Sequence, residues 1–505
     1  MNIAEWLRAA ARDRGGAVAV LDGTDPLWTY EELLDRCRDA AAVLRGQFDI
    51  RPGDRIVLCA RNQPDYLVAM LAVWWVGAVV VPINVKLHHR EIASIIANFE
   101  AALLLVDEDF QAGQVRNQTS VEGLRDLATG DVETVDDGPE PRADTDLAWI
   151  FCTSGTTGPP KGAMLTHGNL CATSMSYLAD VSSVDPDRHY IYAAPMSHGA
   201  GLYAPIHVFA GARHVFPRSR RFDSVEVLSL AAILGSVSLF AAPTMVRRMV
   251  RAAREHRGLG SGLHTVVYGG GPMYLSDIHQ ALQTFGPCLV QIYGQGESPM
   301  TICALRKEQH VHSDPQTLDG RLSSVGTPHA VVSVRVVDEA GRPLATGQTG
   351  EIEVCGPTVM VGYWNDPQST ERVLRDGWLR TGDLGSFDDA GYLILRGRSK
   401  DVIITGGSNV YPREVEDVLL RHPGVDEAAV VGLPDDEWGE VVVAVVTATE
   451  GSVLEPAELD SHCLEELARF KRPRRYVLRS DLPKNAYGKV LKTALVEELT
   501  ASPTD

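Results

Sequence analysis

The most chemically informative stretch of the chain is FCTSGTTGPPKGAMLTH at residues 151–167. It contains a loop that is rich in glycine and in hydroxyl side chains and that ends near a lysine. Glycine lets backbone N–H groups approach an anion closely, and the hydroxyls and Lys161 add donors and positive charge, so the loop is suited to hold phosphate. A Walker loop is excluded, because Pro160 stands where that loop has its second glycine. The residues expected to contact phosphate are Thr153, Ser154, Gly155, Thr156, Thr157, Gly158 and Lys161.

The loop sequence TSGTTGPPKG resembles the signature of the adenylate-forming superfamily, which includes acyl-CoA synthetases, 4-coumarate–CoA ligases, luciferases and peptide-synthetase adenylation domains. The resemblance covers nearly the whole chain, from WTYEEL at residues 28–33 to Lys489, with motifs in the family's order. It implies an AMP-forming acid–thiol ligase that uses ATP, Mg²⁺ and CoA. Within the superfamily, QIYGQGESPM at residues 291–300 and APMSHGAGLY at residues 194–203 resemble most those of feruloyl- and 4-coumaroyl-CoA synthetases and related bacterial ligases.

Two further motifs resemble parts of the family's nucleotide site. The sequence YGQGE at residues 293–297 matches the pattern Y-G-x-T-E, in which the tyrosine packs beside the adenine and the glutamate helps to hold Mg²⁺. Gly296 stands where the family has a threonine whose hydroxyl meets the α-phosphate, which leaves this contact to a water molecule or a neighbouring group. The glycine run at residues 269–271 follows another apolar stretch, and in the family this segment lines the adenine and acid pockets. The expected ATP, AMP and metal contacts here are Gly270, Gly271, Pro272, Tyr293, Gly294, Gln295, Gly296 and, for the metal, Glu297.

The later motifs resemble the family's ribose, hinge and catalytic positions. Asp383 lies in TGDLG and Arg398 in GRSKD, and a carboxylate with a guanidinium can bind the hydroxyl groups of ribose. Lys400 stands at the family hinge, about which the C-terminal domain rotates between the two half-reactions. Lys489, in PKNAYGK, would reach the α-phosphate and stabilise the charge that develops there.

The acid pocket is expected around APMSHGAGLY at residues 194–203. His198 resembles the family's aromatic or histidine gate, and it is not required as a base because a carboxylate is already ionised at neutral pH. Small residues at positions 199, 201 and 271 would leave room for a flat or elongated acid. These features favour an aromatic, hydroxycinnamic-type acid, with fatty or other aliphatic acids as the alternative. The expected lining is His198, Gly199, Gly271, Ile292, Pro299 and Met300.

The resemblance places the entry of CoA beside a different loop, GGSNVYP at residues 406–412. In the family this loop borders the pantetheine tunnel after the C-terminal domain has rotated, and Gly406 and Gly407 would leave room for a thin chain. Lys471, in the basic cluster KRPRR, is expected to hold phosphates of CoA. A solvated charged face explains the same cluster equally well.

Two other functions remain open on the sequence alone. A stand-alone adenylation enzyme would pass the acyl group to a carrier-protein thiol rather than to CoA. A nucleotide-binding protein that has lost its chemistry would explain Gly296, but Lys489, Glu297 and Asp383 are all present and argue against it.

Composition narrows the class of protein. The 505 residues include 47 Lys and Arg and 66 Asp and Glu, and this net charge of −19 excludes a protein that covers nucleic-acid phosphates with a basic face. The eight cysteines are single, without a C-x-x-C pair. Residues 1–16 predict an amphipathic helix rather than a signal peptide, and reduced thiols in a cytoplasmic protein are the simplest account of the cysteines. As for its assembly, we expect a monomer or homodimer. The apolar run at residues 66–82 predicts a buried helix and a buried strand, divided at Gly77, rather than a membrane span.

These motifs need a framework of alternating strands and helices. Up to about residue 330, short apolar runs alternate with helical patterns, which is typical of an α/β fold with buried, mostly parallel sheets. Residues 330–398 alternate apolar and polar side chains and predict an antiparallel sheet or small β-barrel. The remainder predicts a smaller α+β domain, with a helix at LEELARF, residues 464–470. We therefore expect an N-terminal adenylation domain at 1–398 and a mobile C-terminal lid domain at 399–505.

Overall fold

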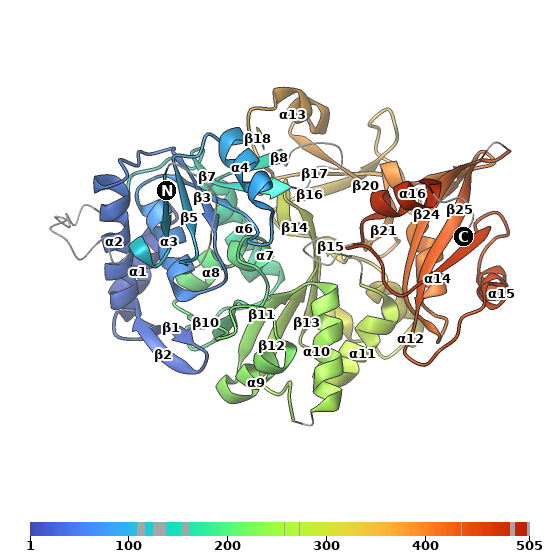
Figure 1. Ribbon diagram of the computed structural model, residues 1–505, viewed down its shortest axis with the longest axis horizontal. Coiled ribbons are helices and arrows are strands. Elements are labelled where there is room, and N and C mark those ends of the chain that lie inside the picture. The colour runs from blue at the N-terminus through green and yellow to red at the C-terminus, as the bar shows by residue number, and fades with distance from the viewer. Residues whose placement is uncertain are drawn as a thin grey trace.

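The structure of the protein is a computed structural model that describes residues 1–108, 117–124, 138–153, 161–256, 258–271, 273–435, 437–484 and 490–501. Two large sheets form the N-terminal part, and a small sheet and a C-terminal α+β unit adjoin them (Figure 1). The α/β fold class expected from the sequence is confirmed. Some residues assigned above to nucleotide contacts lie outside the described residues, namely Ser154, Gly155, Thr156, Thr157, Gly158, Pro272 and Lys489.

The larger sheet has nine strands, and its central part is parallel. Strands β1, β9, β10, β11, β12 and β13 pair with one another in parallel, whereas β2, β14 and β15 pair antiparallel at the edges. In order across the sheet the strands are β15 (Thr327–Pro328), β14 (Ser298–Leu305), β13 (Leu289–Gln295), β12 (Leu263–Tyr268), β11 (Val237–Ala241), β9 (His189–Ile191), β10 (Arg213–Phe216), β1 (Val18–Asp22) and β2 (Asp25–Thr29).

The second large sheet has seven strands, again with a parallel centre. Its two antiparallel strands lie at one edge, where β8 pairs with β7 on one side and with β18 on the other. In order the strands are β18 (Gly362–Tyr363), β8 (Lys161–Thr166), β7 (Leu147–Thr153), β4 (Val79–Pro82), β3 (Arg55–Cys59), β5 (Leu103–Val106) and β6 (Gln118–Ser120).

The two smaller sheets carry Asp383, Arg398 and the turn at Gly406 and Gly407. The first is antiparallel, as the alternating pattern predicts, and consists of β16 (Ser333–Val337), β17 (Gly350–Cys355), β19 (Leu374–Arg375), β20 (Trp378–Phe387) and β21 (Leu393–Arg398). The second belongs to the C-terminal unit and consists of β22 (Ile403–Thr405), β23 (Ser408–Val410), β24 (Val425–Asp435), β25 (Gly439–Ala448) and β26 (Arg475–Arg479).

Helices connect and cover the strands, and several begin at a side chain that satisfies the exposed N–H groups of the first turn. Thr29 and Thr166 form reciprocal capping boxes with Glu32 and Asn169 at α2 and α6. The helices of the described residues are α1 (Glu5–Arg14), α2 (Tyr30–Gly46), α3 (Pro64–Trp75), α4 (His89–Asn98), α6 (His167–Asp180), α7 (Gly199–Leu202), α8 (Ala204–Phe209), α9 (Ser224–Leu234), α10 (Pro243–Glu255), α11 (Leu275–Phe285), α12 (Pro315–Leu322), α13 (Pro367–Val373), α14 (Pro412–Leu419), α15 (Pro456–Glu466) and α16 (Lys492–Ala501).

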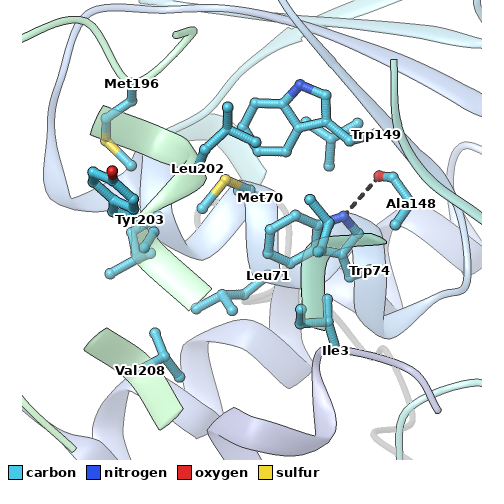
Figure 2. Close-up of a cluster of buried hydrophobic side chains, with 14 of the residues drawn as sticks. Ile3, Met70, Leu71, Trp74, Ala148, Trp149, Met196, Leu202, Tyr203 and Val208 are labelled. Carbon is cyan, nitrogen blue, oxygen red and sulfur yellow. Dashed lines mark hydrogen bonds between the residues drawn. The ribbon is translucent and has the colours of Figure 1, made fainter. Parts of the chain in front are cut away.

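The long apolar run forms α3 and β4 at the centre of the N-terminal core. Every residue of α3 except Asp65 is buried. Figure 2 shows Met70 and Trp74 of this helix packed beside Trp149 of β7, with Trp74 Nε1 donating to the carbonyl of Ala148 at 2.8 Å. The run is therefore core, as expected. Within the described part of the chain, every helix is too short or too polar to cross a bilayer.

The chain changes sheets near residue 398. Strand β21 ends at Arg398 in the small sheet, and β22 begins at Ile403 in the C-terminal sheet, which lies beside β20 and β21 at one end of the molecule (Figure 1). The division into domains at 398/399 stays a prediction. The helix expected at residues 464–470 is only partly present, because α15 starts at Pro456, where proline favours a first turn, and ends at Glu466 before the extended Leu467.

Three buried histidines make the fold sensitive to acid. Burial lowers the pKa of His207 and of His310 to about 4 and the pKa of His214 to about 3. In the unfolded chain these groups titrate near 6.5, so between pH 6.5 and 4 the unfolded state binds more protons than the folded state. Above pH 6.5 the histidines are neutral in both states, and the stability of the fold is fully present. As the pH falls from 6.5 to 4, protonation of the unfolded chain lowers the free energy of unfolding.

We expect replacement of His310 by glutamine to reduce this acid sensitivity. One buried group that resists protonation is removed, so the pH slope of the free energy of unfolding should fall by up to about 1.4 kcal/mol per pH unit. Urea unfolding at pH 6.5, 5.5 and 4.5 measures the slope. His312→Gln, at an exposed histidine on the same segment, is the control. Identical slopes for His310→Gln and the wild type would contradict the assignment.

Candidate active site

One cavity of about 1890 Å³ lies where the large sheets, the small sheet and the C-terminal unit meet. Strands β11, β12 and β13 are parallel, so their carboxyl ends share an edge, and Ala242, Gly269 and Gly296 just beyond them line the cavity. Sites for one small ligand measure roughly 300–1,000 Å³, so more than one substrate fits. Lysines and arginines outnumber carboxylates in the lining of this acidic chain, which favours polyanions such as nucleotides.

The expected phosphate loop is closed at its base by two paired strands. Strands β7 and β8 are antiparallel, and Thr153 pairs with Lys161, so both residues lie at the cavity wall. Lys161 Nζ donates to Ser369 Oγ at 2.8 Å and lies 5.0 Å from the ring centroid of Tyr363. Ser369, on α13, could not be identified from the sequence, because a lone serine carries no signal until the fold brings it to Lys161.

Glu297 lies in the turn between β13 and β14 and lines the cavity. Its Oε1 accepts a hydrogen bond of 2.6 Å from the hydroxyl of Tyr363. Burial and the nearby Glu297 raise the pKa of Tyr363, so the phenol stays protonated and donates. Across the described residues no lysine or arginine forms an ion pair with Glu297, so this half-buried carboxylate fits a cation. One carboxylate beside phosphate oxygens is a donor set that Mg²⁺ accepts.

Asp383 on β20 is a buried carboxylate held by three side chains. Its Oδ2 accepts from the Tyr293 hydroxyl at 2.7 Å and from Gln295 Nε2 at 2.6 Å. Strand pairing places Arg398 opposite Asp383, and Arg398 Nε lies 3.2 Å from Oδ1. Among the described residues, Tyr293 and Asp383 are both absent from the cavity lining, whereas Gly294, Gln295 and Arg398 line it. The tyrosine expected beside the adenine therefore orients Asp383 through its hydroxyl.

The apolar part of the cavity is built around His198, just before α7. The imidazole packs against the ring of Phe151, with centroids 5.0 Å apart. Burial lowers the pKa of His198 to about 4, so the ring is neutral at pH 7, and its Nδ1–H donates to the carbonyl of Ser197 at 2.8 Å. A neutral ring with Nε2 as an acceptor suits the wall of an acid pocket better than a cationic group would.

The small residues expected to leave room for the acid do not all do so. A Cβ at Gly199 would lie 2.8 Å from the ring of Phe240, and one at Gly201 would lie 1.9 Å from the carbonyl oxygen of Met196. Both glycines therefore make room for protein atoms, and the ring of Phe240 forms the wall instead. At Gly271 a Cβ would fit without a clash, since its nearest neighbour, Pro243 Cδ, would be in ordinary van der Waals contact at 3.9 Å.

The other expected pocket residues lie mostly on β13, β14 and the end of β12. Ile292, Pro299 and Met300 line the cavity, as does Gly270, whose φ of +81° favours glycine. Gly271 follows Gly270 but lies outside the described lining. Phe151 and Phe240 were not identified from the sequence, because an aromatic residue in a buried strand looks like ordinary core until the neighbouring strands are placed.

The residues expected to contact CoA are not brought to the cavity. Gly406 and Gly407 form the turn between β22 and β23, and Lys471 Nζ pairs with Glu414 at 2.6 Å. Within the described chain, the C-terminal unit instead presents residues 490–493 to the cavity, and Lys400 reaches it from the linker.

Comparison with protein families shows to which family the chain belongs. Residues 7–364 match the model of the AMP-binding enzyme family, and residues 414–489 match that of the AMP-binding enzyme C-terminal domain. The chain belongs to the AMP-binding enzyme family. The superfamily expected from the sequence motifs is thereby confirmed.

Individual relatives are similar over nearly the full length of this AMP-binding enzyme. A feruloyl-CoA synthase from an Amycolatopsis species is 35% identical, with 97% of this chain and 98% of that protein covered. ATP-bound MatB from Rhodopseudomonas palustris has a TM-score of 0.88 at 31% identity, with 99% of each chain covered. O-succinylbenzoate–CoA synthetase (MenE) of Bacillus subtilis, in complex with ATP and magnesium, has a TM-score of 0.86 at 29% identity, with 97% of this chain and 98% of that chain covered. The expected enzyme class, an AMP-forming acid–CoA ligase, is confirmed.

Gly296, where the sequence motif of the AMP-binding enzymes favours threonine, is explained by its neighbours. A Cβ at this position would lie 2.4 Å from Thr153 Cγ2 and 2.7 Å from Phe151 Cδ1. These two side chains occupy the space that a threonine would need, so glycine is a packing requirement here.

We expect Gly296→Thr to impair the enzyme rather than restore a missing contact. Overpacking of this kind costs about 1–3 kcal/mol of stability, so the melting temperature and pyrophosphate release should both fall. Thermal unfolding and a pyrophosphate assay measure the two effects. Adding Thr153→Ser and Phe151→Val removes both clashing groups and should recover part of the stability. A single variant as stable and as active as the wild type would refute the packing argument.

Proposed function

We propose that this AMP-forming acid–CoA ligase acts on an aromatic, hydroxycinnamic-type carboxylic acid. The observation that carries the proposal is one cavity with two unlike parts. Lys161, Glu297 and Arg398 line the part suited to a magnesium nucleotide. Phe151 and Phe240 with the residues around them line an apolar part suited to a flat ring, because aromatic walls favour offset or edge-on contact with an aromatic ligand.

The nucleotide would be fixed by the charged side chains of the cavity. Lys161 and the loop that it closes would hold the outer phosphates, and Asp383 with Arg398 would bind the ribose. Glu297 would hold Mg²⁺ together with phosphate oxygens, and the bound ion would neutralise charge on the polyphosphate. In the described part of the chain no cluster of three metal-binding side chains occurs, so phosphate oxygens are needed to complete such a site.

The first half-reaction forms a mixed anhydride. An oxygen of the acid attacks the α-phosphorus, the bond to the β-phosphate oxygen breaks, and pyrophosphate leaves. The acid is already a carboxylate at neutral pH and needs no base. Catalysis then depends on positioning and on cationic groups where charge develops, with Lys489 proposed at the α-phosphate. Residues 490–493, directly after Lys489, line the cavity, which supports assigning this arrangement of the domains to adenylation.

The second half-reaction would use a different arrangement of the C-terminal domain. The thiol of CoA loses its proton and attacks the carbonyl carbon of the anhydride, and AMP leaves as the thioester forms. Gly406, Gly407 and Lys471 lie away from the cavity in the present arrangement. Their proposed contacts with CoA therefore require the rotation that is expected at Lys400.

A panel of acids tests the proposed substrate class. Ferulate, 4-coumarate, benzoate and octanoate are compared by pyrophosphate release and by thioester formation, with and without CoA. We expect ferulate or 4-coumarate to give the highest kcat/KM and to yield a thioester only with CoA. Octanoate as the best substrate would overturn the aromatic assignment. Adenylate that accumulates in the presence of CoA would point instead to a carrier-protein acceptor.

A matched pair of variants tests the two arrangements of the domains. Lys489→Ala should slow adenylation about 10²–10³-fold, the scale for loss of one well-placed charge-stabilising donor, and should spare thioester formation from supplied acyl adenylate. Gly407→Leu should block the thioester step and leave acid-dependent pyrophosphate exchange intact. Each half-reaction is assayed separately for both variants. Equal losses in both half-reactions for either variant would contradict the assignment.

A further inference from the structure

An ion pair crosses the contact between the N-terminal part and the C-terminal unit. Arg247, on α10, donates from Nη2 to Oε1 of Glu427 on β24, at 2.9 Å. Only 15% of the Glu427 side chain and 27% of the Arg247 side chain are exposed. This shielding separates the pair from ordinary surface ion pairs, which are screened by solvent and contribute little.

The other oxygen of Glu427 holds the segment that leads to Lys489. Lys484 Nζ donates to Glu427 Oε2 at 2.6 Å. Lys484 also forms an antiparallel bridge with Val490, and the N–H of Leu491 donates to the carbonyl of Pro483 at 2.8 Å. The two ends of residues 485–489 are therefore tied together beside Glu427, and residues 490–493 go on to line the cavity.

A second glutamate anchors the far side of this segment within the C-terminal unit alone. Lys492 Nζ pairs with Oε1 of Glu416 at 2.6 Å, and the same oxygen accepts from the N–H of Val430. That anchor does not involve the N-terminal part. Among the described residues, Glu427 is the one of the two glutamates that forms an ion pair across the domain contact. Whether Glu427 makes this ion pair therefore depends on how the domains are arranged.

Arg247 also has an acidic neighbour within the N-terminal part itself. Asp277, on α11 of the N-terminal part, lies 3.9 Å from Arg247 Nε, and Arg247 offsets the combined charge of Asp277, Asp426 and Glu427. An arginine left fully unpaired in a shielded site would make domain rotation costly. The nearby Asp277 reduces that cost, so the bond to Glu427 can be exchanged.

We propose that Glu427 is a positioning residue for adenylation, because it couples the docking of the C-terminal unit on Arg247 to the placement of the segment that carries Lys489. The inference rests on the proposed function in one respect, the role of Lys489. Glu427 touches neither substrate nor nucleotide in this assignment and acts through Lys484. Loss of the coupling should therefore slow the half-reaction that needs Lys489 and leave the other unchanged.

The test compares Glu427→Gln with a matched control, Glu466→Gln. The control removes an exposed ion pair with Arg421 in the same C-terminal unit. Glu427→Gln should lower acid-dependent ATP–pyrophosphate exchange about tenfold and change thioester formation from supplied feruloyl adenylate by less than about twofold. Glu466→Gln should change neither rate. Equal losses of both half-reactions, or no difference from the control, would overturn the proposal.

A second measurement does not depend on the identity of the acid. Amide hydrogen exchange of peptides spanning residues 483–493 should be faster in Glu427→Gln than in the wild type or Glu466→Gln. Arg247→Gln should have a similar effect, and the double variant should be no worse than either single variant because the groups act as one unit. Additive effects, or unchanged exchange, would overturn the coupling. If the wild type releases no pyrophosphate with any acid, the proposed function fails while this readout still tests the coupling.

Discussion

The buried carboxylate of Asp383 joins the parts of the molecule that must act together. It receives hydrogen bonds from Tyr293 and Gln295 of the nine-stranded sheet, lies on the small sheet, and pairs with Arg398, the last residue before the linker. A buried carboxylate is tolerated only when such partners satisfy it. The same bonds therefore tie the nine-stranded sheet to the small sheet and fix the orientation of the carboxylate.

The cavity next to Asp383 would serve two reactions in the proposed mechanism. A carboxylate is a poor electrophile until AMP is attached, and both steps are proposed to depend on which groups the C-terminal unit presents. Here residues 490–493 face the cavity while the turn at Gly406 and Gly407 lies elsewhere. The ion pair between Arg247 and Glu427 would give the proposed two states of the domain contact a physical basis.

Local chemistry could be predicted from the sequence, and long-range packing could not. The strand-and-glycine pattern indicated the parallel sheets, and short motifs indicated Glu297, Asp383 and Arg398. The bond of Tyr363 to Glu297 joins residues 66 positions apart, and the Arg247 bond to Glu427 spans 180 positions. Neither pair has a local pattern, because each exists only once separate elements meet.

The most direct test of the account follows the oxygen atoms of the acid. Ferulate labelled with ¹⁸O at both carboxylate oxygens is incubated with the enzyme, ATP, Mg²⁺ and CoA. The masses of AMP and of the thioester are then measured by mass spectrometry. Attack of the carboxylate on the α-phosphorus predicts that AMP carries one ¹⁸O atom and that the thioester keeps the other. Unlabelled AMP beside labelled thioester, or label in inorganic phosphate, would contradict the acyl-adenylate intermediate on which the account rests.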